Sequence, residues 1–359
     1  FRRVLFRSLR RSDGLPVPNA KGFSVGGSNI DVFVGFAEDG IDPSKSLSQQ
    51  PGKLYGFGAE GISFGLLMVD SDNGDYMAMK AHADLITPFG INPNDFQLYA
   101  RDIDFEINLG KDLDSPALNL VESFGPQGYK VDTGSTPVYL NMTVPRLRVR
   151  LGYAALQISE FVYLGGSFEF QQGDIVRLDV KSSLGTITDV PAESMTIGAT
   201  NVQAFIGAGG PYRKDTNKDG VINTLDEVTP GATGLVVDDL SFGYGVYKTK
   251  VDLNNPASLL VAGKKFTAMR ASANMVGFVG LPENLTFKIK DVDVYVNDAD
   301  DDLFTADFSK SGPDKKGMPI ATGDPNRPMI IDMNERVISA SIGWAKDRKS
   351  TRLNSSHVS

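Results

Sequence analysis

Apolar and polar residues alternate along much of the chain with the period of two that β-strands produce. In the run LRVRLG, for example, Leu147, Val149 and Leu151 alternate with arginines. This pattern places apolar side chains on one face and polar ones on the other, which is typical of an antiparallel sheet with one solvated face. No long stretch shows a helical apolar stripe with caps, and turn-forming clusters recur throughout. The predicted fold class is therefore all-β.

The parity of the apolar positions switches at two places. Apolar residues have even numbers before Asp102 and odd numbers after it, and the reverse switch occurs at Asp291. Because a slip of one residue turns every later side chain over, the pattern predicts a β-bulge or tight bend at both aspartates. Pattern alone leaves two architectures open, an elongated meandering sheet, which we favour, and β-sandwich domains.

The chain matches itself over long distances. SVGGSNIDVFVG (24–35) pairs with TIGATNVQAFIG (196–207), and YMAMKAHA (76–83) pairs with FTAMRASA (266–273). The offset of about 170 to 190 residues is far longer than the roughly 20 to 50 residues of solenoid repeats, so we predict tandem copies of a whole domain.

The expected domains follow from this match and from the two ends. Residues 1–8 and 347–359 resemble translated sequencing-library adapter and are set apart from the fold. Copy 1 is then 9–194 and copy 2 is 195–346, which would be truncated. The boundary is expected within 181–194, a stretch rich in Ser, Thr, Gly and Pro.

Composition excludes several classes of protein. The formal net charge is −8 with no cysteine, which excludes a disulfide scaffold and a strongly basic nucleic-acid binder. The end segments carry more basic than acidic residues, so the rest of the chain is more acidic still. No apolar run reaches the roughly 18 residues of a membrane helix, and no membrane insertion is expected.

One motif has specific chemistry. DTNKDGVINTLDE (215–227) has the spacing of a calcium loop, with oxygen-bearing residues at positions 1, 3, 5, 9 and 12 and Gly220 at position 6, where a sharp turn is needed. The expected Ca²⁺ ligands are Asp215, Asn217, Asp219, Asn223 and Asp226, with the backbone carbonyl of Val221. The corresponding stretch of copy 1, 37–46, lacks this set, so the loop is expected to be a local stabiliser and the only cofactor expected is calcium.

The loop resembles the dockerin variety of EF-hand loop, with Asn at position 9 and Asp at position 12. It departs from a dockerin in being single, and Thr229, Pro230 and Gly231 would stop a following helix. The resemblance therefore implies calcium binding and does not extend to a cohesin partner.

Three other acidic or reactive patterns have simpler interpretations. Asn297–Asp302 (NDADDD) could hold a second ion, but its irregular spacing favours a solvated loop. Asp70–Asp75 (DSDNGD) has its glycine one position too early for a calcium loop and predicts a hairpin turn. VDTGS (131–135) has the letters of an aspartic-protease turn, but copy 2 has Ala321 in place of the aspartate, so we expect a plain turn.

No catalytic constellation is duplicated between the copies. His82 is the only histidine outside the end segments, and Ser272 stands at its place in copy 2, so we expect a surface side chain there and no enzyme. The chain is also dense in aromatic residues near 153–170, which are expected in the core, with sugar stacking as the alternative.

The repeats resemble those of very large, repetitive bacterial extracellular proteins described as adhesin-like. The matching phrases include AFIGAGGPYRKDTNKDGVIN, DLSFGYGV and LQISEFVYLGGSFEF. The resemblance implies a non-catalytic structural or adhesive section of a secreted or surface protein, locally stabilised by calcium. Its partners would be neighbouring repeats of the same chain and cell-surface glycans or matrix. The alternative is a carbohydrate-binding module of a secreted multi-domain enzyme.

Overall fold

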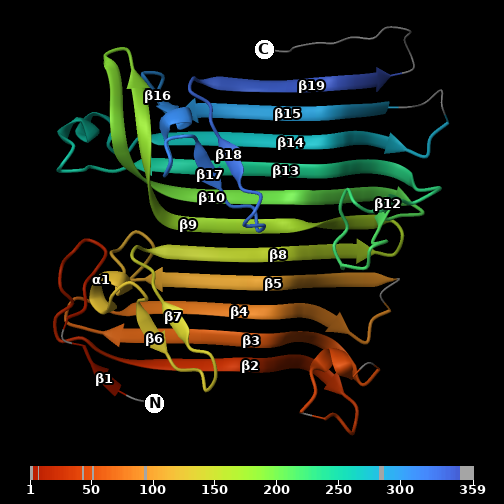
Figure 1. Cartoon of the computed structure of the whole chain (residues 1–359), viewed down its shortest axis with the longest axis horizontal. Coiled ribbons are helices and arrows are strands. Elements are labelled where there is room, and N and C mark those ends of the chain that lie inside the picture. The colour runs from red at the N-terminus through yellow and green to blue at the C-terminus, as the bar shows by residue number, and fades with distance from the viewer. Residues whose placement is uncertain are drawn as a thin grey trace. The chain divides into compact units, whose positions relative to one another are not determined.

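The computed structural model describes residues 3–6, 8–42, 44–50, 52–92, 95–282 and 287–347. Residues 1, 2, 7 and 348–359, which belong to the two end segments set apart above, lie outside the described residues. Long antiparallel strands dominate the described chain, and helices are confined to a few short turns (Figure 1). The prediction of an all-β, antiparallel fold is confirmed. None of the described helices is long and apolar enough to cross a bilayer.

The chain divides into two compact units. Unit 1 contains Phe1–Ile91, Tyr99–Leu151 and Gln171–Asp174, and unit 2 contains Asn92–Leu98, Gly152–Phe170 and Ile175–Ser359. Strands β5 (Phe96–Leu109), β8 (Arg146–Ile158) and β9 (Val162–Ser182) have residues in both units.

Unit 1 is built on an antiparallel meander whose strands pair in chain order. These strands are β1 (Arg3–Leu5), β2 (Lys21–Ala37), β3 (Leu54–Asp70), β4 (Tyr76–Phe89) and β5 (Phe96–Leu109). The shorter elements are η1 (Leu47–Gln49), α1 (Leu120–Phe124), β6 (Tyr129–Val131) and β7 (Val138–Leu140). The hairpin β6–β7 lies in front of the sheet in Figure 1.

Unit 2 repeats this arrangement. Its meander consists of β10 (Gly185–Ala208), β13 (Thr233–Thr249), β14 (Lys265–Val279), β15 (Phe287–Ala299) and β19 (Val337–Asp347). The shorter elements are β11 (Arg213–Lys214), β12 (Glu227–Val228), η2 (Pro256–Val261), β16 (Phe304–Asp307), η4 (Phe308–Lys310), β17 (Met318–Ile320) and β18 (Met329–Ile331). The hairpin β17–β18 also lies in front of its sheet (Figure 1), and β16 pairs with β9.

Each hairpin encloses a hydrophobic core against one face of its sheet. In unit 1 Leu67, Val69 and Ala78 of the sheet are buried with Val131 and Leu140 of the hairpin. The corresponding core of unit 2 contains Tyr247, Phe266, Ala268, Ile320 and Ile331.

Glycines on the sheet make room for these hairpins. A Cβ at Gly65 would lie 3.0 Å from the Val138 side chain, and one at Gly243 would lie 3.0 Å from Met329. Since such contacts are tighter than ordinary packing allows, the absence of a side chain at both places lets the hairpin approach the sheet closely.

The bends predicted at Asp102 and Asp291 are confirmed. Both residues have a left-handed backbone with a φ of 54°, and the regular pairing is interrupted beside each of them. Other strands of the same sheets carry left-handed residues as well, Asn29 in β2 and Gly61 in β3 of unit 1, and Asn201 in β10 and Asp239 in β13 of unit 2. The left-handed residues in these strands turn the following side chains over at this level, which explains the parity switch.

The units do not divide where composition predicted a boundary. Residues 181–194 form the end of β9, the turn after it and the first part of β10, all within unit 2. The main division falls between Leu151 and Gly152, inside β8. At the other end, Phe6 packs edge-on against Phe124 and Tyr129, so part of the first end segment contacts the core of unit 1.

Candidate functional site

The predicted calcium loop is closed by a small β-ladder. Strands β11 and β12 enter and leave the loop, and Lys214 pairs with Glu227 across its base. No helix flanks it, as the Thr229, Pro230 and Gly231 sequence predicts. The loop's conformation therefore depends on hydrogen bonds among its own residues.

Three side chains at the start of the loop accept hydrogen bonds from backbone amides further along it. Asp215 Oδ2 accepts from Gly220 at 2.9 Å, Asn217 Oδ1 from Asp219 at 3.0 Å, and Asp219 Oδ1 from Val221 at 2.7 Å. Gly220 has a φ of 75°, the left-handed conformation that favours glycine at this turn. The side chains at positions 1, 3 and 5 thus hold successive turns of the loop backbone through these hydrogen bonds.

Asp226 joins the two ends of the loop. It is buried, its Oδ1 accepts from the Thr216 amide at 3.0 Å, and its Oδ2 accepts from the Asn223 amide at 2.9 Å. Its backbone oxygen accepts from Arg213 at 2.7 Å. Arg213 in turn donates two 2.8 Å hydrogen bonds to the Asp238 carboxylate on β13, which attaches the loop to the sheet of unit 2.

A buried tyrosine pair forms a further anchor. The hydroxyls of Tyr153 and Tyr163 are 2.6 Å apart, and the Tyr153 hydroxyl accepts from the backbone amide of Ile222 at 3.1 Å. Both rings are buried, as expected for core aromatics. They are not available for sugar stacking.

One oxygen of the loop has no partner. Asp215 Oδ1 is inaccessible to solvent and accepts no hydrogen bond. A buried carboxylate oxygen without a partner is costly, and coordination of a hard cation would satisfy it. The residues that would hold Ca²⁺ are those predicted above, Asp215, Asn217, Asp219, Val221, Asn223 and Asp226.

The carboxylates alone do not make this a compact acidic site. Among the described residues, the one set of three metal-binding side chains with ligand atoms within 4.8 Å of one another is His82, Asp102 and Asp104, and the loop contributes none. Amide and carbonyl oxygens would therefore have to complete the coordination, as is usual for calcium loops.

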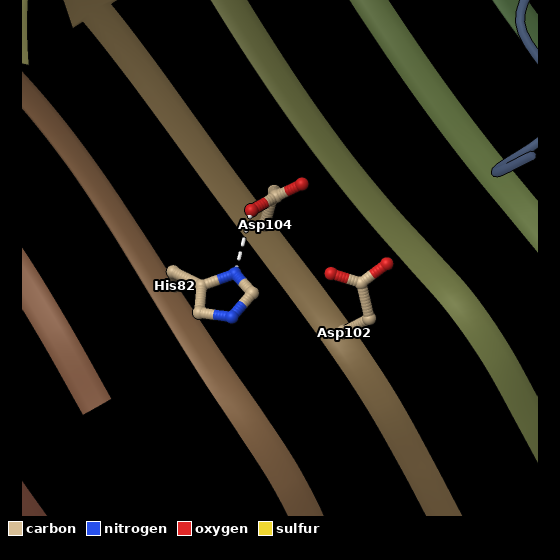
Figure 2. A group of neighbouring side chains, drawn as sticks. All are labelled: His82, Asp102 and Asp104. Carbon is tan, nitrogen blue, oxygen red and sulfur yellow. Dashed lines mark hydrogen bonds and ion pairs between the residues drawn. The ribbon is translucent and has the colours of Figure 1, made fainter. Parts of the chain in front are cut away.

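The His82 cluster was not predicted from the sequence. The register of β4 and β5 pairs His82 with Asp104, and His82 Nδ1 lies 2.8 Å from Asp104 Oδ1 (Figure 2). His82 Nε2 lies 3.2 Å from Asp84 Oδ1. Ser63 is the cross-strand neighbour of His82 on β3, but neither ring nitrogen bonds to it, so the arrangement is not that of a catalytic triad.

Arg150 already neutralises the carboxylates of this cluster. It donates to Asp104 Oδ2 at 2.8 Å and to Asp102 Oδ2 at 2.7 Å. These bonds and charges raise the pKa of Arg150 against the effect of its burial, and they help to lower the pKa of Asp104. A metal ion would have to compete with this guanidinium for both aspartates, so the cluster is an ion-pair network.

The network continues along the same face of unit 1. Glu106 accepts from Arg146 at 2.9 Å and lies 3.3 Å from Lys80, and Arg146 also pairs with Asp174. Burial raises the pKa of Glu106, but the charges of Lys80, Arg146 and Arg148 outweigh it and the net shift is downward. A depression of about 300 Å³ lies over this network and is lined by alternating charges. Opposite charges in such contact favour a structural role.

The remaining acidic motifs have structural partners. Asp298 and Asp302 pair with Arg336, and Asp301 pairs with Lys264, so three of the four aspartates in 297–302 are ion-paired. Asp132 in VDTGS pairs with Lys130 at 2.9 Å in the turn after β6. Asp70–Asp75 connects β3 to β4 as the predicted hairpin turn.

Comparison with known proteins yields no relatives. No family model, no curated protein and no solved structure matches the chain.

Proposed function

We propose that the chain is a non-catalytic structural section of a large extracellular or cell-surface bacterial protein, built from two related β-sheet units and locally stabilised by calcium. The observation that carries the calcium part is the buried, unpartnered Oδ1 of Asp215 in a loop whose oxygen-bearing residues have calcium-loop spacing. The recurrence of the same meander and hairpin in both units supports a repeated scaffold.

The position of the loop supports a stabilising role. It connects β10 to β13 in unit 2, whereas β2 and β3 of unit 1 are connected by a segment that includes η1 and lacks the ligand set. The same meander therefore forms with and without the loop. A bound ion would hold the β11–β12 ladder and, through Arg213 and Asp238, the start of β13.

The proposed extracellular location sets the range of calcium affinity that the loop would need. Extracellular calcium modules have dissociation constants of about 10⁻⁴ to 10⁻³ M. At millimolar calcium and a dissociation constant of ~10⁻⁴ M, binding would add roughly 1.4 kcal/mol to the free energy of unfolding. The resemblance of the repeats to those of large bacterial extracellular proteins is the basis for proposing a secreted or surface location. It is also the basis for proposing neighbouring repeats, glycans or matrix as partners. A carbohydrate-binding module is the alternative; Tyr153 and Tyr163 are buried and would not take part in it, whereas Phe161 is half exposed.

Thermal unfolding with and without calcium tests the proposal. We expect 1 mM CaCl₂ to raise the midpoint of unfolding of unit 2 by about 3 °C over the value in EDTA, following the calcium contribution given above. Asp215→Asn removes the carboxylate charge at position 1 and should abolish the shift.

The matched control is Asp39→Asn, in the corresponding segment of unit 1, which should keep the full shift. Equal midpoints with calcium and EDTA in the wild-type protein would rule out calcium stabilisation. A shift that survives in Asp215→Asn would place the ion elsewhere.

A further inference from the structure

The sheet of unit 1 has one covered face and one open face. The hairpin β6–β7 and its core cover the face that presents Leu67, Val69 and Ala78. The residues between them in the strands, such as Leu66, Met68 and Met79, point to the opposite face, because side chains alternate along a strand. Within the described residues, no element packs as a second layer on this open face of unit 1.

The open face continues on both sides of the level at which the left-handed residues turn the side chains over, which we call the line of the parity switch. A Cβ at Gly27 would lie 2.6 Å from Ile30 Cδ1 and 3.1 Å from the Phe64 ring, so positions three apart share this face. From Ile30 the alternation continues to Val32 and Val34. Apolar residues on both sides of the line therefore form one surface, as the parity switch in the sequence indicates.

Cross-strand pairs show that apolar side chains lie next to one another from strand to strand on this surface. Phe36 pairs with Tyr55, Val34 with Phe57, and Ala59 with Ile86. We call the resulting set the open apolar face; it consists of Phe23, Val25, Gly27, Ile30, Val32, Val34, Phe36, Tyr55, Phe57, Ala59, Ile62, Phe64, Leu66, Met68, Met77, Met79, Ala81, Ala83, Ile86, Pro88, Ala100, Ile103, Phe105, Ile107 and Leu109. None of these side chains is charged.

The exposed area matches what a stable interface needs. Val34 is 72% exposed and Phe36 is 66% exposed, and six more members of the face are more than a third exposed. At ~150 to 250 Å² for a large side chain, these eight alone present on the order of 700 Å². A standard protein interface buries about 800 Å² on each partner, and an isolated monomer rarely exposes an apolar patch this large.

We propose that the open apolar face of unit 1 packs against the same face of a second copy of this chain, as two sheets about 10 Å apart. A second copy presents an identical flat, uncharged surface, so a two-fold arrangement brings no like charges together at its centre. At the rim, Lys21 pairs across the strands with Asp70, which places both signs of charge there. The acidic net charge disfavours the other apolar occupant, an anionic lipid surface.

Sedimentation velocity of the full chain over a range of concentrations tests this interface. We expect the wild-type protein to form dimers, and Val34→Lys to raise the dimer dissociation constant by at least about 100-fold, because an unpaired ammonium group would be buried in each copy. Val34 is largely exposed, so the variant should fold, and its circular dichroism spectrum should match the wild type.

Leu184→Lys is the matched control. Leu184 is 94% exposed in the turn between β9 and β10, outside the open apolar face, and its substitution should leave the dissociation constant unchanged. Dimers that form equally well in EDTA would separate this interface from the calcium proposal, whose own readout is the shift in the unfolding midpoint.

A second measurement covers the case in which Val34→Lys destabilises the fold. The chain has no cysteine, so a spin label on Asp39→Cys, in the segment after β2, is unique to each copy. Dipolar coupling between labels is expected in the wild-type background and not after Val34→Lys. A monomer at all concentrations, a dimer insensitive to Val34→Lys, or a monomer that binds phosphatidylserine vesicles instead would overturn the proposal.

Discussion

Asn108 and Asn297 make the same pair of hydrogen bonds in the two units. Asn108 Nδ2 donates to the carbonyls of Leu118 and Val144 at 2.8 Å each. Asn297 Nδ2 donates to the carbonyls of Ala306 and Glu335 at 2.9 Å each. Both side chains are fully buried, and in both the Oδ1 atom has no partner. Each asparagine thus joins a strand of the sheet to the two ends of the segment that forms the hairpin.

Replacing either asparagine should destabilise its own unit. Asn297→Ala leaves the carbonyls of Ala306 and Glu335 buried without a donor, and we expect a loss of about 2 kcal/mol in the free energy of unfolding. Urea denaturation followed by circular dichroism measures this loss. Asn326→Ala, in an exposed turn, should change stability by less than about 0.5 kcal/mol. Similar stabilities for the two variants would show that the buried hydrogen bonds are not needed.

A second prediction follows from the left-handed backbone conformation of Asp291. A β-branched side chain is strained at a φ of 54°, so Asp291→Val should cost about 1 to 2 kcal/mol. Asp293→Val, two residues further along β15, should be neutral or stabilising, because valine favours a regular strand. Chemical denaturation of both variants measures the difference. If Asp293→Val proved the more harmful, the strain argument would be wrong.

His82 should make the stability of unit 1 depend on pH. Burial lowers its pKa, but the hydrogen bond and charge of Asp104, with Asp84 and Asp102, outweigh burial and the net shift is upward from 6.5. Arg150 also donates hydrogen bonds to Asp104 and Asp102. A raised folded-state pKa contributes stability that is complete below about pH 6.5 and is lost as the pH rises through the folded-state value.

The variant His82→Gln isolates this contribution. The wild-type protein should be the more stable at pH 5.5, by less than about 1 kcal/mol because the side chain is 38% exposed, and the advantage should fade by about pH 8. Denaturation of both proteins at the two pH values measures it, and 1 M NaCl should weaken it. The other histidine, His357, is present in both proteins, so its titration cancels. A constant difference across this pH range would exclude a titrating His82.

The structure also shows which features sequence could predict. The bends at Asp102 and Asp291 were predictable because the parity of the apolar positions changes in the sequence on either side of each residue. The His82 network was not, since it needs the register of β4 on β5 and Arg150 from β8, and neither register nor long-range pairing can be read from one strand's pattern. The only sequence signal was a lone histidine with Asp84 two residues later, which is common on exposed strands.

The compact units divide within β8, whereas the predicted boundary between the copies lies at 181–194 and stays a prediction. Turn-forming composition at 181–194 marks the ends of strands as readily as the ends of domains. The ligands of the predicted calcium loop were named from spacing within the motif. The anchors outside the motif, Tyr153 and Asp238, come from other parts of unit 2 and could not be read from that spacing.

The left-handed residues at the parity switch also restrict where a strand can gain or lose a residue. β3 and β13 both contain 17 residues, and the offset between the matching sequence segments changes from 172 to 190 mainly in the connections between strands. Adding or deleting one residue within a strand would exchange its core and solvent sides beyond that point. Additional residues are therefore better accommodated in the turns, as in the segment between β10 and β13, than within a strand on the core side of such a position.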